Sequence, residues 1–254
     1  MYNPTIKISL ITVCYNSDHT IRDTIESVLS QQYKNFEYII VDGGSTDKTL
    51  NIINEYSDRV DEVISEADKG IYDAMNKGIK HASGNVVGIL NSDDVLYDSS
   101  CFGLIAKKFE DEPDIDATYG DLEIVNRGDL SKVIRRYSSK NFAKWKIRFG
   151  FMLPHPTFYA RRELFEKLGY YKLDYRVSAD FELITRFLSS GIKAKRIPEK
   201  IVKMRNGGIS TNGFWWRIHQ NIEIIRACRE NNISSNILFI SLKIPFKLFS
   251  YCRF

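Results

Sequence analysis

The chain has 254 residues, of which 43% are hydrophobic and 27% charged, and its formal net charge is +4. This composition is typical of a soluble globular protein, and we expect one main domain. The four cysteines show no CxxC or CxxH spacing, which argues against a zinc site or a disulfide framework and favours a reducing, cytoplasmic setting.

The charge is divided unequally along the chain. Residues 1–130 carry 11 Lys or Arg and 24 Asp or Glu, whereas residues 131–254 carry 25 and 8. The acidic half suits a metal ion and the basic half suits anions, for which nucleic acid, phospholipid headgroups and a pyrophosphate-bearing substrate are the candidates. The alternative is that this surface charge only keeps the protein soluble.

In the first half, apolar strand-like runs alternate with helical patterns, as in βαβ units. The first run is β-branched and lacks a basic leader and a small-residue cleavage site, so we interpret it as a strand and not as a signal peptide. The pattern predicts a mostly parallel sheet with strands at 6–14, 36–41, 62–64 and 85–90.

Three helices are expected between these strands. The first contains the apolar residues 21, 25, 28 and 29 at helical spacing, and Ser17 or Asp18 is its candidate cap. The second begins near residues 45–47, and the third covers 71–81. Their apolar stripes are predicted to be core and not cofactor contacts.

Past Asp114 the pattern becomes less regular. A strand is expected at 117–125, followed by a basic segment at 132–148 and a loop around Pro154-His155-Pro156. A helix is predicted at 179–188, and two short extended runs are predicted within 193–204, on either side of Pro198.

The last segment, 232–254, combines Leu, Ile and Phe with three basic residues and is interrupted by Pro245. It is too short and too charged to span a bilayer. We expect it to lie in the headgroup region of an anionic membrane, and the alternative is a helix packed on the domain or in an oligomer interface.

Acidic residues stand at or just after the ends of predicted strands and loops, where open α/β sheets bind ligands. Two glycines follow Asp42 and let the backbone approach a ligand closely, so its carboxylate is a candidate acceptor for the N3 hydrogen of a uracil ring; the alternative is a helix cap. The other acidic positions are Asp68, the pair Asp93-Asp94, and Asp180.

The pair Asp93-Asp94 directly follows the apolar run 85–90 and predicts a metal site. A Mg²⁺ or Mn²⁺ ion takes one or two protein carboxylates and fills its other positions with phosphate oxygens and water. Such an ion would neutralise the charge that builds on a departing nucleoside diphosphate. The alternative is a solvated Asp-Asp turn.

Four segments together resemble family 2 glycosyltransferases in order and spacing, over roughly residues 5 to 210. The resemblance implies a GT-A fold (a Rossmann-like, mostly parallel sheet flanked by helices), a nucleotide-sugar donor, a divalent metal and inversion at the anomeric carbon. The segments are Thr12-Val13-Cys14-Tyr15-Asn16, Val41-Asp42-Gly43-Gly44-Ser45-Thr46-Asp47, Asp68-Lys69-Gly70-Ile71-Tyr72-Asp73-Ala74-Met75-Asn76 and Asn91-Ser92-Asp93-Asp94.

The resemblance also implies roles for individual residues. Asp94 resembles the metal ligand of the family's DxD-like motif, and Asp93 is expected to contact the ribose or the metal. The residues expected to bind the nucleotide are Thr12, Tyr15, Asp42, Asp68, Lys69 and Asp93.

Asp180 looks like the Asp of the family's Glu-Asp catalytic motif, with Ala179 in place of the Glu. An inverting transfer needs a base that deprotonates the acceptor hydroxyl, and we assign this role to Asp180; a helix N-cap is the alternative. The secondary candidates for acceptor or phosphate contacts are His155, Asp121 and Arg205, each of which also has a purely structural interpretation.

The sequence therefore predicts a GT-A domain at 1–231, with a nucleotide-binding half at 1–115 and an acceptor-binding half at 116–231, and a basic amphipathic tail at 232–254. The expected reaction moves a hexose or N-acetylhexosamine from a UDP-sugar to a glycan hydroxyl, on a lipid-linked acceptor at the inner face of a bacterial plasma membrane. We expect no nucleic-acid partner and leave the oligomeric state open. The rival functions are a nucleotidyltransferase and a non-catalytic sugar-nucleotide or glycan-binding module, although no Gly-rich, Lys-containing phosphate loop follows the first strand.

Overall fold

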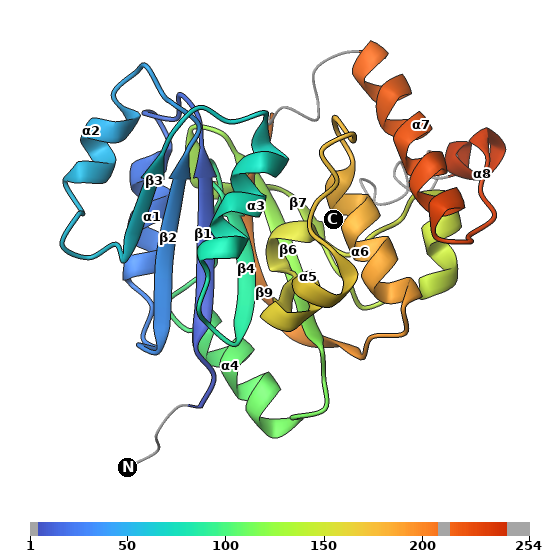
Figure 1. The fold of residues 1–254 in the computed structure, drawn as a ribbon, viewed down its shortest axis with the longest axis horizontal. Coiled ribbons are helices and arrows are strands. Elements are labelled where there is room, and N and C mark those ends of the chain that lie inside the picture. The colour runs from blue at the N-terminus through green and yellow to red at the C-terminus, as the bar shows by residue number, and fades with distance from the viewer. Residues whose placement is uncertain (1–4, 208–213, 243–254) are drawn as a thin grey trace.

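The structure is a computed structural model, and it describes residues 5–207 and 214–242. A nine-stranded sheet runs through this part of the chain (Figure 1). Its strands are β1 (Ile8–Cys14), β2 (Phe36–Asp42), β3 (Glu62–Ser65), β4 (Val86–Asn91), β5 (Val95–Leu96), β6 (Ala117–Asn126), β7 (Asp129–Tyr137), β8 (Tyr159–Arg161) and β9 (Ala194–Arg205). The strand order is β3-β2-β1-β4-β8-β6-β9-β5, and β7 pairs with β6.

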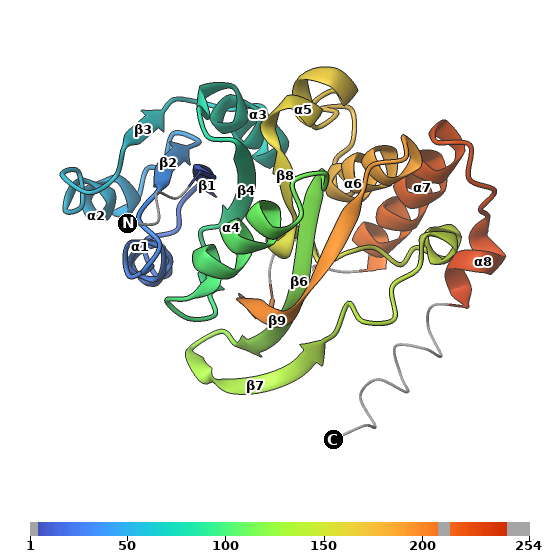
Figure 2. The ribbon, with the colours of Figure 1, turned by 90° about the horizontal axis from the view of Figure 1, so that it is seen from below.

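The helices cover both faces of this sheet (Figures 1 and 2). They are α1 (Ile21–Leu29), α2 (Thr49–Asn54), α3 (Ile71–His81), α4 (Cys101–Asp111), α5 (Arg162–Leu168), α6 (Ala179–Ser189), α7 (Phe214–Glu230) and α8 (Ile237–Ser241), with short 3₁₀ turns η1 (Lys144–Phe149) and η2 (His155–Thr157). Residues of α1, α2 and α4 share one hydrophobic core, and residues of α3, α5, α6 and α7 share the other.

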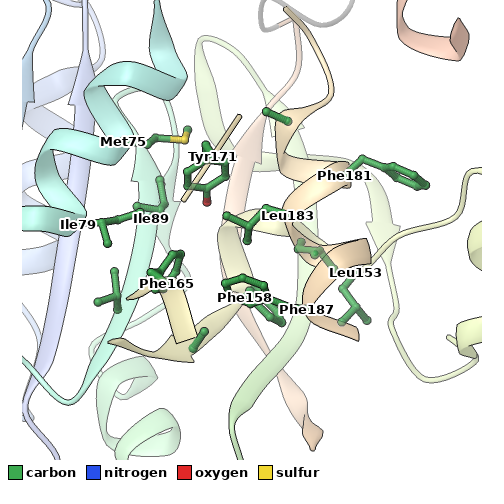
Figure 3. Packing of buried hydrophobic residues seen from close by; sticks show 14 of the residues in the cluster. Met75, Ile79, Ile89, Leu153, Phe158, Phe165, Tyr171, Phe181, Leu183 and Phe187 are labelled. Atoms are coloured by element: carbon green, nitrogen blue, oxygen red, sulfur yellow. The ribbon is translucent and has the colours of Figure 1, made fainter. Parts of the chain in front are cut away.

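Side chains alternate between these two cores along β1, as the period of a strand requires. Ile8 and Leu10 lie in the core with α1, whereas Ile11 and Val13 lie in the core with α3. Figure 3 shows the second core, in which residues of α3 and β4 face aromatic and aliphatic residues of the second half: Met75, Ile79, Ile89, Leu153, Phe158, Phe165, Tyr171, Phe181, Leu183 and Phe187.

The four strands predicted in the first half are confirmed, and they pair in parallel. The second half is mixed, because β8 runs antiparallel to β4 and β6, β7 forms a hairpin with β6, and β5 runs antiparallel to β9. The predicted parallel order therefore holds for the first four strands, and β6 and β9 also pair in parallel, while the remaining pairings are antiparallel. The basic segment 132–148 contains most of β7, which pairs with β6 alone and exposes much of its surface, so it lacks the apolar run of a buried strand.

Two predicted extended runs around Pro198 are instead one strand, β9. Its pairing with β6 shifts between Tyr119, opposite Arg196, and Asp121, opposite Lys200, so Pro198 lies in the irregular part of the ladder. A proline has no N–H for a regular ladder, and the bulge removes that conflict without ending the strand.

The first two helices do not begin with the predicted cap residues. Thr20 is the N-cap residue of α1, and no side-chain cap bond is present there; Ser17 contributes its backbone carbonyl, which accepts the N–H groups of Thr20 and Ile21. The second helix begins at Thr49, later than predicted, and Asp47 Oδ1 accepts the Thr49 N–H at 2.9 Å. The third helix begins and ends as predicted.

Part of the predicted tail is described. Residues 232–242 contain α8, which packs against η1 and buries Ile240, while residues 243–254 lie outside the described residues. Within 5–207 and 214–242, no helix has both the length and the apolar character needed to cross a bilayer.

Candidate functional site

The carboxyl ends of β2, β1 and β4 lie side by side at one edge of the sheet. Cys14 is in register with Asp42, and Val13 is in register with Asn91. The segments that follow these strands therefore begin at the same level, as expected for a ligand site in an open α/β sheet.

Asp42 is fully buried and organises the loop that follows β2. Its Oδ2 accepts the N–H groups of Gly44 at 3.1 Å and Ser45 at 3.0 Å, and the hydroxyl of Ser65 at 2.8 Å. Oδ1 has only longer contacts, with the Ser45 N–H at 3.3 Å and the Cys14 thiol at 3.7 Å. The loop is thus held by one carboxylate whose Oδ1 retains acceptor capacity.

Asp68 lies directly against this loop. A Cβ atom at Gly43 would stand 2.3 Å from Asp68 Oδ2, so any other residue there would displace the Asp68 carboxylate. Asp68 Oδ1 accepts the Gly70 N–H at 2.8 Å, which fixes the turn before α3. The structure therefore brings Asp42 and Asp68 to the same place, and Lys69 is exposed beside them.

The two candidates from β1 and its following turn differ in exposure. Tyr15 is exposed just beyond the strand, whereas Thr12 is fully buried and its hydroxyl accepts the Tyr38 O–H at 3.0 Å. Asn16 connects this turn to the Asp42 loop, because its N–H donates to Ser45 Oγ at 2.8 Å and its Oδ1 accepts the Thr46 N–H at 2.8 Å.

Asp94, like Asp42, is deeply buried at this edge, with 1% of its surface exposed. Its Oδ1 accepts the Arg205 N–H at 3.2 Å, whereas its Oδ2 is buried without a hydrogen-bond partner, as is Asn91 Oδ1. The turn itself is fixed by Thr24 of α1, whose hydroxyl lies 2.9 Å from the Ser92 carbonyl and 2.7 Å from the Asp94 carbonyl. Such rigid placement of an unsatisfied carboxylate oxygen calls for an explanation.

The Arg205 side chain holds this acidic turn from the end of β9. Its guanidinium donates to the Asp93 carbonyl at 2.8 Å and the Arg127 carbonyl at 3.1 Å, and it pairs with Asp23 of α1. The side chain is buried, so its bonds are structural in this state, and its predicted contact with phosphate or acceptor stays a hypothesis.

A divalent cation fits the chemistry of this turn. Burial raises the pKa of Asp93 and of Asp94, and the neighbouring Asp93 charge raises that of Asp94 further. A cation would offset both effects, and the two unpartnered oxygens of Asp94 and Asn91 are hard ligands. No group of three His, Cys, Asp or Glu side chains suited to a metal occurs in the part of the chain that the structure describes.

Asp180 lies in the first turn of α6, and its Oδ1 accepts the Phe181 N–H at 2.8 Å. Burial raises the pKa of this carboxyl group, although the nearby His155 acts in the opposite direction. His155 is itself buried, which lowers its pKa, and its Nε2 lies 2.7 Å from Tyr171 Oη. The structure thus brings two sequence candidates, Asp180 and His155, together.

Tyr72 and Asn76 connect this second group to the Asp68 turn. Tyr72 Oη donates to the Val177 carbonyl at 2.7 Å, and its ring stacks on that of Tyr171 at 5.8 Å. The Asn76 amide donates to the Tyr171 carbonyl at 2.8 Å and accepts its N–H at 2.9 Å. Both residues belong to the α3 motif, so the segment that begins at Asp68 also positions the loop that leads to Asp180.

Sequence reasoning missed Glu223, a residue of α7 that holds the backbone just before Asp180. Its carboxylate accepts three consecutive N–H groups, those of Arg176 at 2.7 Å, Val177 at 2.9 Å and Ser178 at 2.8 Å. Its negative charge also contributes to the raised pKa of Asp180, after burial. No local sequence pattern predicts this contact, because more than 40 residues separate Glu223 from the loop.

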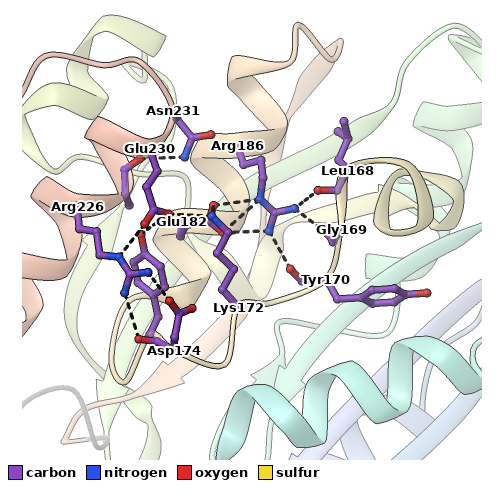
Figure 4. A network of polar contacts seen from close by, with 12 residues as sticks. Leu168, Gly169, Tyr170, Lys172, Asp174, Glu182, Arg186, Arg226, Glu230 and Asn231 are labelled. Carbon is purple, nitrogen blue, oxygen red and sulfur yellow. Dashed lines mark hydrogen bonds and ion pairs between the residues drawn. The ribbon is translucent and has the colours of Figure 1, made fainter.

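A second missed group fixes the body of α6 (Figure 4). Glu182 is fully buried and accepts bonds from Arg186, at 3.0 Å from Nε and 2.9 Å from the terminal nitrogen, and pairs with Lys172 at 3.0 Å. Arg186 also donates to the carbonyls of Gly169 and Tyr170, each at 2.8 Å. The i, i+4 spacing of Glu182 and Arg186 is the signal in the sequence that indicates this pair.

Asp121 belongs to a different cluster, on β6. Its carboxylate accepts the Ser139 N–H at 2.8 Å and hydroxyl at 2.7 Å, and the Ser138 hydroxyl at 2.9 Å, and it pairs with Arg196 at 2.7 Å. Burial opposes ionisation, yet these bonds lower the pKa of Asp121 overall. The bonds fasten the residues after β7 to β6 and β9, and a contact with the acceptor stays a hypothesis.

The chain matches the model of the family described as glycosyl transferase family 2 over residues 9–169. It is 32% identical over 214 residues to a PGL/p-HBAD biosynthesis glycosyltransferase of Mycobacterium bovis, covering 80% of this chain and 78% of the relative. It is 26% identical over 246 residues to the putative glycosyltransferase EpsE of Bacillus subtilis, covering 88% and 82%.

Solved structures share the fold. The chain resembles S. aureus TarS 1-349 in complex with UDP-GlcNAc with a TM-score of 0.70 at 18% identity, covering 87% of this chain and 66% of that one. It resembles the mannosyltransferase PcManGT of Pyrobaculum calidifontis, in complex with GDP-Man and Mn²⁺, with a TM-score of 0.66 at 21% identity, covering 92% and 67%. The chain thus spans about two thirds of each solved chain. The matched segment includes the Asp42, Asp68 and Asp94 turns, and the chain belongs to glycosyl transferase family 2, with a GT-A fold.

Proposed function

We propose that this glycosyltransferase moves a hexose or N-acetylhexosamine from a UDP-sugar to a hydroxyl of a glycan, with inversion at the anomeric carbon. The observation that carries the proposal is the buried carboxylate of Asp94, whose Oδ2 has no partner although the turn around it is rigidly held. In a family 2 enzyme, a site for a divalent cation beside the donor diphosphate accounts for this oxygen.

Asp94, assisted by Asp93 or the Asn91 side chain, would hold Mn²⁺ or Mg²⁺. The bound ion supplies electrostatic stabilisation of the negative charge that develops on the leaving diphosphate. The proposal agrees with the Mn²⁺ and GDP-Man of the mannosyltransferase relative in fold. Arg205 positions this turn through the Asp93 carbonyl and through its own N–H to Asp94.

The nucleotide base would bind at the loop that Asp42 organises. Asp42 Oδ1 is the carboxylate oxygen with acceptor capacity left, which suits the N3 hydrogen of uracil. Asp68 and Lys69 flank this loop, and Tyr15 is exposed at its other side. The bound UDP and UDP-GlcNAc of two TarS structures are consistent with a uridine donor.

Asp180 would act as the base that removes the proton of the acceptor hydroxyl. Its raised pKa makes the carboxylate a better proton acceptor than an exposed aspartate, provided that the pH is high enough to ionise it. Burial lowers the pKa of the neighbouring His155, whose Nε2 lies 2.7 Å from Tyr171 Oη.

The acceptor is proposed to be a lipid-linked glycan, such as an undecaprenyl-diphosphate saccharide, in bacterial surface polysaccharide synthesis at the inner face of the plasma membrane. The name of the mycobacterial relative refers to PGL/p-HBAD biosynthesis, and a shorter match is to a poly-β-1,6-N-acetyl-D-glucosamine synthase of Staphylococcus epidermidis, 38% identical over 125 residues. The predicted membrane contact of the basic tail 232–254 stays a hypothesis, and residues 243–254 lie outside the described residues.

A screen of UDP- and GDP-sugars for metal-dependent hydrolysis, with and without synthetic lipid-diphosphate acceptors, tests this function. We expect release of UDP that depends on Mn²⁺ or Mg²⁺ and is accelerated by an acceptor. Release of GDP alone would indicate a GDP-sugar donor in place of a UDP-sugar. Formation of a nucleotide-sugar from a nucleoside triphosphate and a sugar phosphate would indicate a nucleotidyltransferase. Donor binding without turnover would indicate a binding module.

Gly43→Ala is expected to weaken UDP binding about tenfold, because the new Cβ displaces Asp68 from the base loop and a loss near 1.4 kcal/mol equals a factor of ten. Gly103→Ala is the matched control, since a Cβ there meets no atom within 4 Å. Isothermal titration with UDP and Mn²⁺ measures both variants. Equal affinities would contradict the assignment of Asp68 to the nucleotide site.

Glu223→Gln is expected to shift the acid limb of the pH dependence of kcat/KM to lower pH. The amide oxygen still accepts loop N–H groups, but the charge that helps raise the pKa of Asp180 is removed, so the base stays ionised at lower pH. A pH profile that coincides with that of the wild type would show that the Glu223 charge does not affect the pKa of the base.

Glu223→Ala, by comparison, also removes the acceptor of three N–H groups. It is expected to cost about 3 kcal/mol of folding free energy, because hydrogen bonds to a charged group contribute more than neutral ones. Thermal unfolding measures this loss, and the Gln variant, which keeps one acceptor oxygen, should lose less stability than the Ala variant.

A further inference from the structure

An exposed surface of η1 and α8 combines aromatic, aliphatic and basic side chains. Trp145 is 61% exposed, and on α8 Leu238 is 73% and Ile237 is 55% exposed. Large apolar side chains that remain this exposed next to one another usually mark an interaction site. We call the surface formed by Lys144, Trp145, Lys146, Ile237 and Leu238 the η1–α8 surface.

These residues form one surface although Lys146 and Ile237 are 91 positions apart in the chain. The Phe149 ring contacts Trp145 at 5.8 Å and Phe239 at 5.3 Å, so aromatic contacts connect the two elements. The Ser235 hydroxyl donates to the Arg148 carbonyl at 2.7 Å and closes the junction. Figure 2 shows the yellow-green turn of η1 beside α8.

The lysines of this surface lie in a basic part of the sequence. Residues 131–162 contain nine Lys or Arg and no Asp or Glu, and residues 231–242, which include α8, contain no Lys, Arg, Asp or Glu. Within the described residues, neither Lys144 nor Lys146 forms an ion pair with a carboxylate. The Lys146 ammonium instead lies 5.7 Å from the Trp145 ring centroid.

We propose that the η1–α8 surface docks on an anionic lipid bilayer, with Trp145 and Leu238 inserted at the level of the headgroups and the lysines bound to lipid phosphates. Tryptophan with flanking lysine is the composition of membrane interfaces, and basic residues next to exposed apolar ones match an anionic leaflet in charge and polarity. The sequence pointed to the tail alone; the structure adds η1, an element of the glycosyltransferase domain itself.

The position of the surface relates it to the acceptor, and this step rests on the proposed function. Ile147 of η1 is buried in the same core as Ala179 and Phe181, the two neighbours of Asp180. The membrane-docking element and the proposed base therefore belong to one rigidly packed unit. Docking would place the base near a glycan whose lipid remains in the bilayer.

The test is sedimentation of the full chain with vesicles of phosphatidylcholine alone or mixed with phosphatidylglycerol. We expect binding to the anionic vesicles that decreases with salt, and a blue shift of tryptophan emission that is lost in Trp145→Phe. Trp145→Ser and Leu238→Ser should each weaken partitioning about tenfold, and Lys144→Gln about fivefold, from the usual contributions of apolar area and of one basic residue near a membrane.

Matched controls are Val63→Ser on β3, at the opposite edge of the sheet, and Lys107→Gln on α4, and both should bind like the wild type. Metal-dependent donor hydrolysis without acceptor should be unchanged in every variant, which separates a failure of docking from a failure of the proposed function. Equal binding to neutral and anionic vesicles, or normal binding by Trp145→Ser, would overturn the proposal. So would a lipid-free dimer, seen by light scattering, that Trp145→Ser dissociates.

Discussion

Asp180→Asn is expected to lower kcat by about 10²- to 10⁴-fold, the usual contribution of a general base, while the affinity for UDP stays within about twofold of the wild type. The asparagine side chain has the same shape and its oxygen still accepts the Phe181 N–H, but it does not accept the proton of the acceptor hydroxyl. Steady-state kinetics with acceptor and titration with UDP measure the two quantities.

The stability of this variant provides the control. Burial raises the pKa of Asp180 in the folded protein, so the folded state binds this proton more tightly than the unfolded chain. The ionised carboxyl group therefore destabilises the fold once the pH rises above the pKa of Asp180 in the unfolded chain. Asp180→Asn removes that effect, so its Tm at neutral pH should equal or exceed that of the wild type. Full turnover in the stable variant would transfer the role of base to another residue.

The wild-type activity should fall at acid pH, at a higher pH than for an exposed aspartate. The base form of Asp180 is lost as the pH decreases through its raised pKa. UDP binding does not need the base, so UDP affinity should not show this loss at acid pH. Comparing the pH dependence of kcat/KM with that of UDP affinity therefore identifies the ionisation of Asp180.

Asp94→Asn is expected to reduce kcat/KM by about 10³-fold, because several kcal/mol of charge stabilisation depend on the cation and each 1.36 kcal/mol equals a factor of ten. The substitution preserves the shape of the side chain and an oxygen acceptor for the Arg205 N–H, so the turn should remain folded. What it removes is the negative charge beside the proposed cation.

Metal binding can be measured without activity. Mn²⁺ at about 100 times its dissociation constant should stabilise the wild type by about 2.7 kcal/mol, a rise in Tm of roughly 5–10 °C, and Asp94→Asn should lose this rise. Asp114→Asn, at an exposed carboxylate, is the control and should keep it. A rise in Tm that survives in Asp94→Asn would place the cation elsewhere.

The local pattern of the chain was sufficient for the first half of the fold. The strands β1, β2 and β4 are buried, and β3 pairs with β2 at the edge of the sheet; their apolar runs, separated by helical patterns, indicate both the strands and their parallel order. The same logic placed Asp42 and Asp94 at the strand ends, because a parallel order brings the carboxyl ends to one edge.

The second half was predicted less completely because its elements are stabilised by distant partners. The strand β7 has one neighbour, β8 has three residues, and β9 continues through Pro198 only because its pairing with β6 shifts there. Each of these depends on a register that is set across the sheet, and short or half-exposed strands carry little periodic signal.

For the site, the sequence by itself determined which acidic residues stand at strand ends and which segments resemble the family. Only the tertiary structure decided their environments: Asp94 Oδ2 is buried without a hydrogen-bond partner, and Asp180 has His155, Tyr72 and Glu223 as neighbours. The reason is physical. Residue type and spacing are local properties of the chain, whereas burial, an unsatisfied oxygen and a shifted pKa arise when segments far apart in sequence exclude water together.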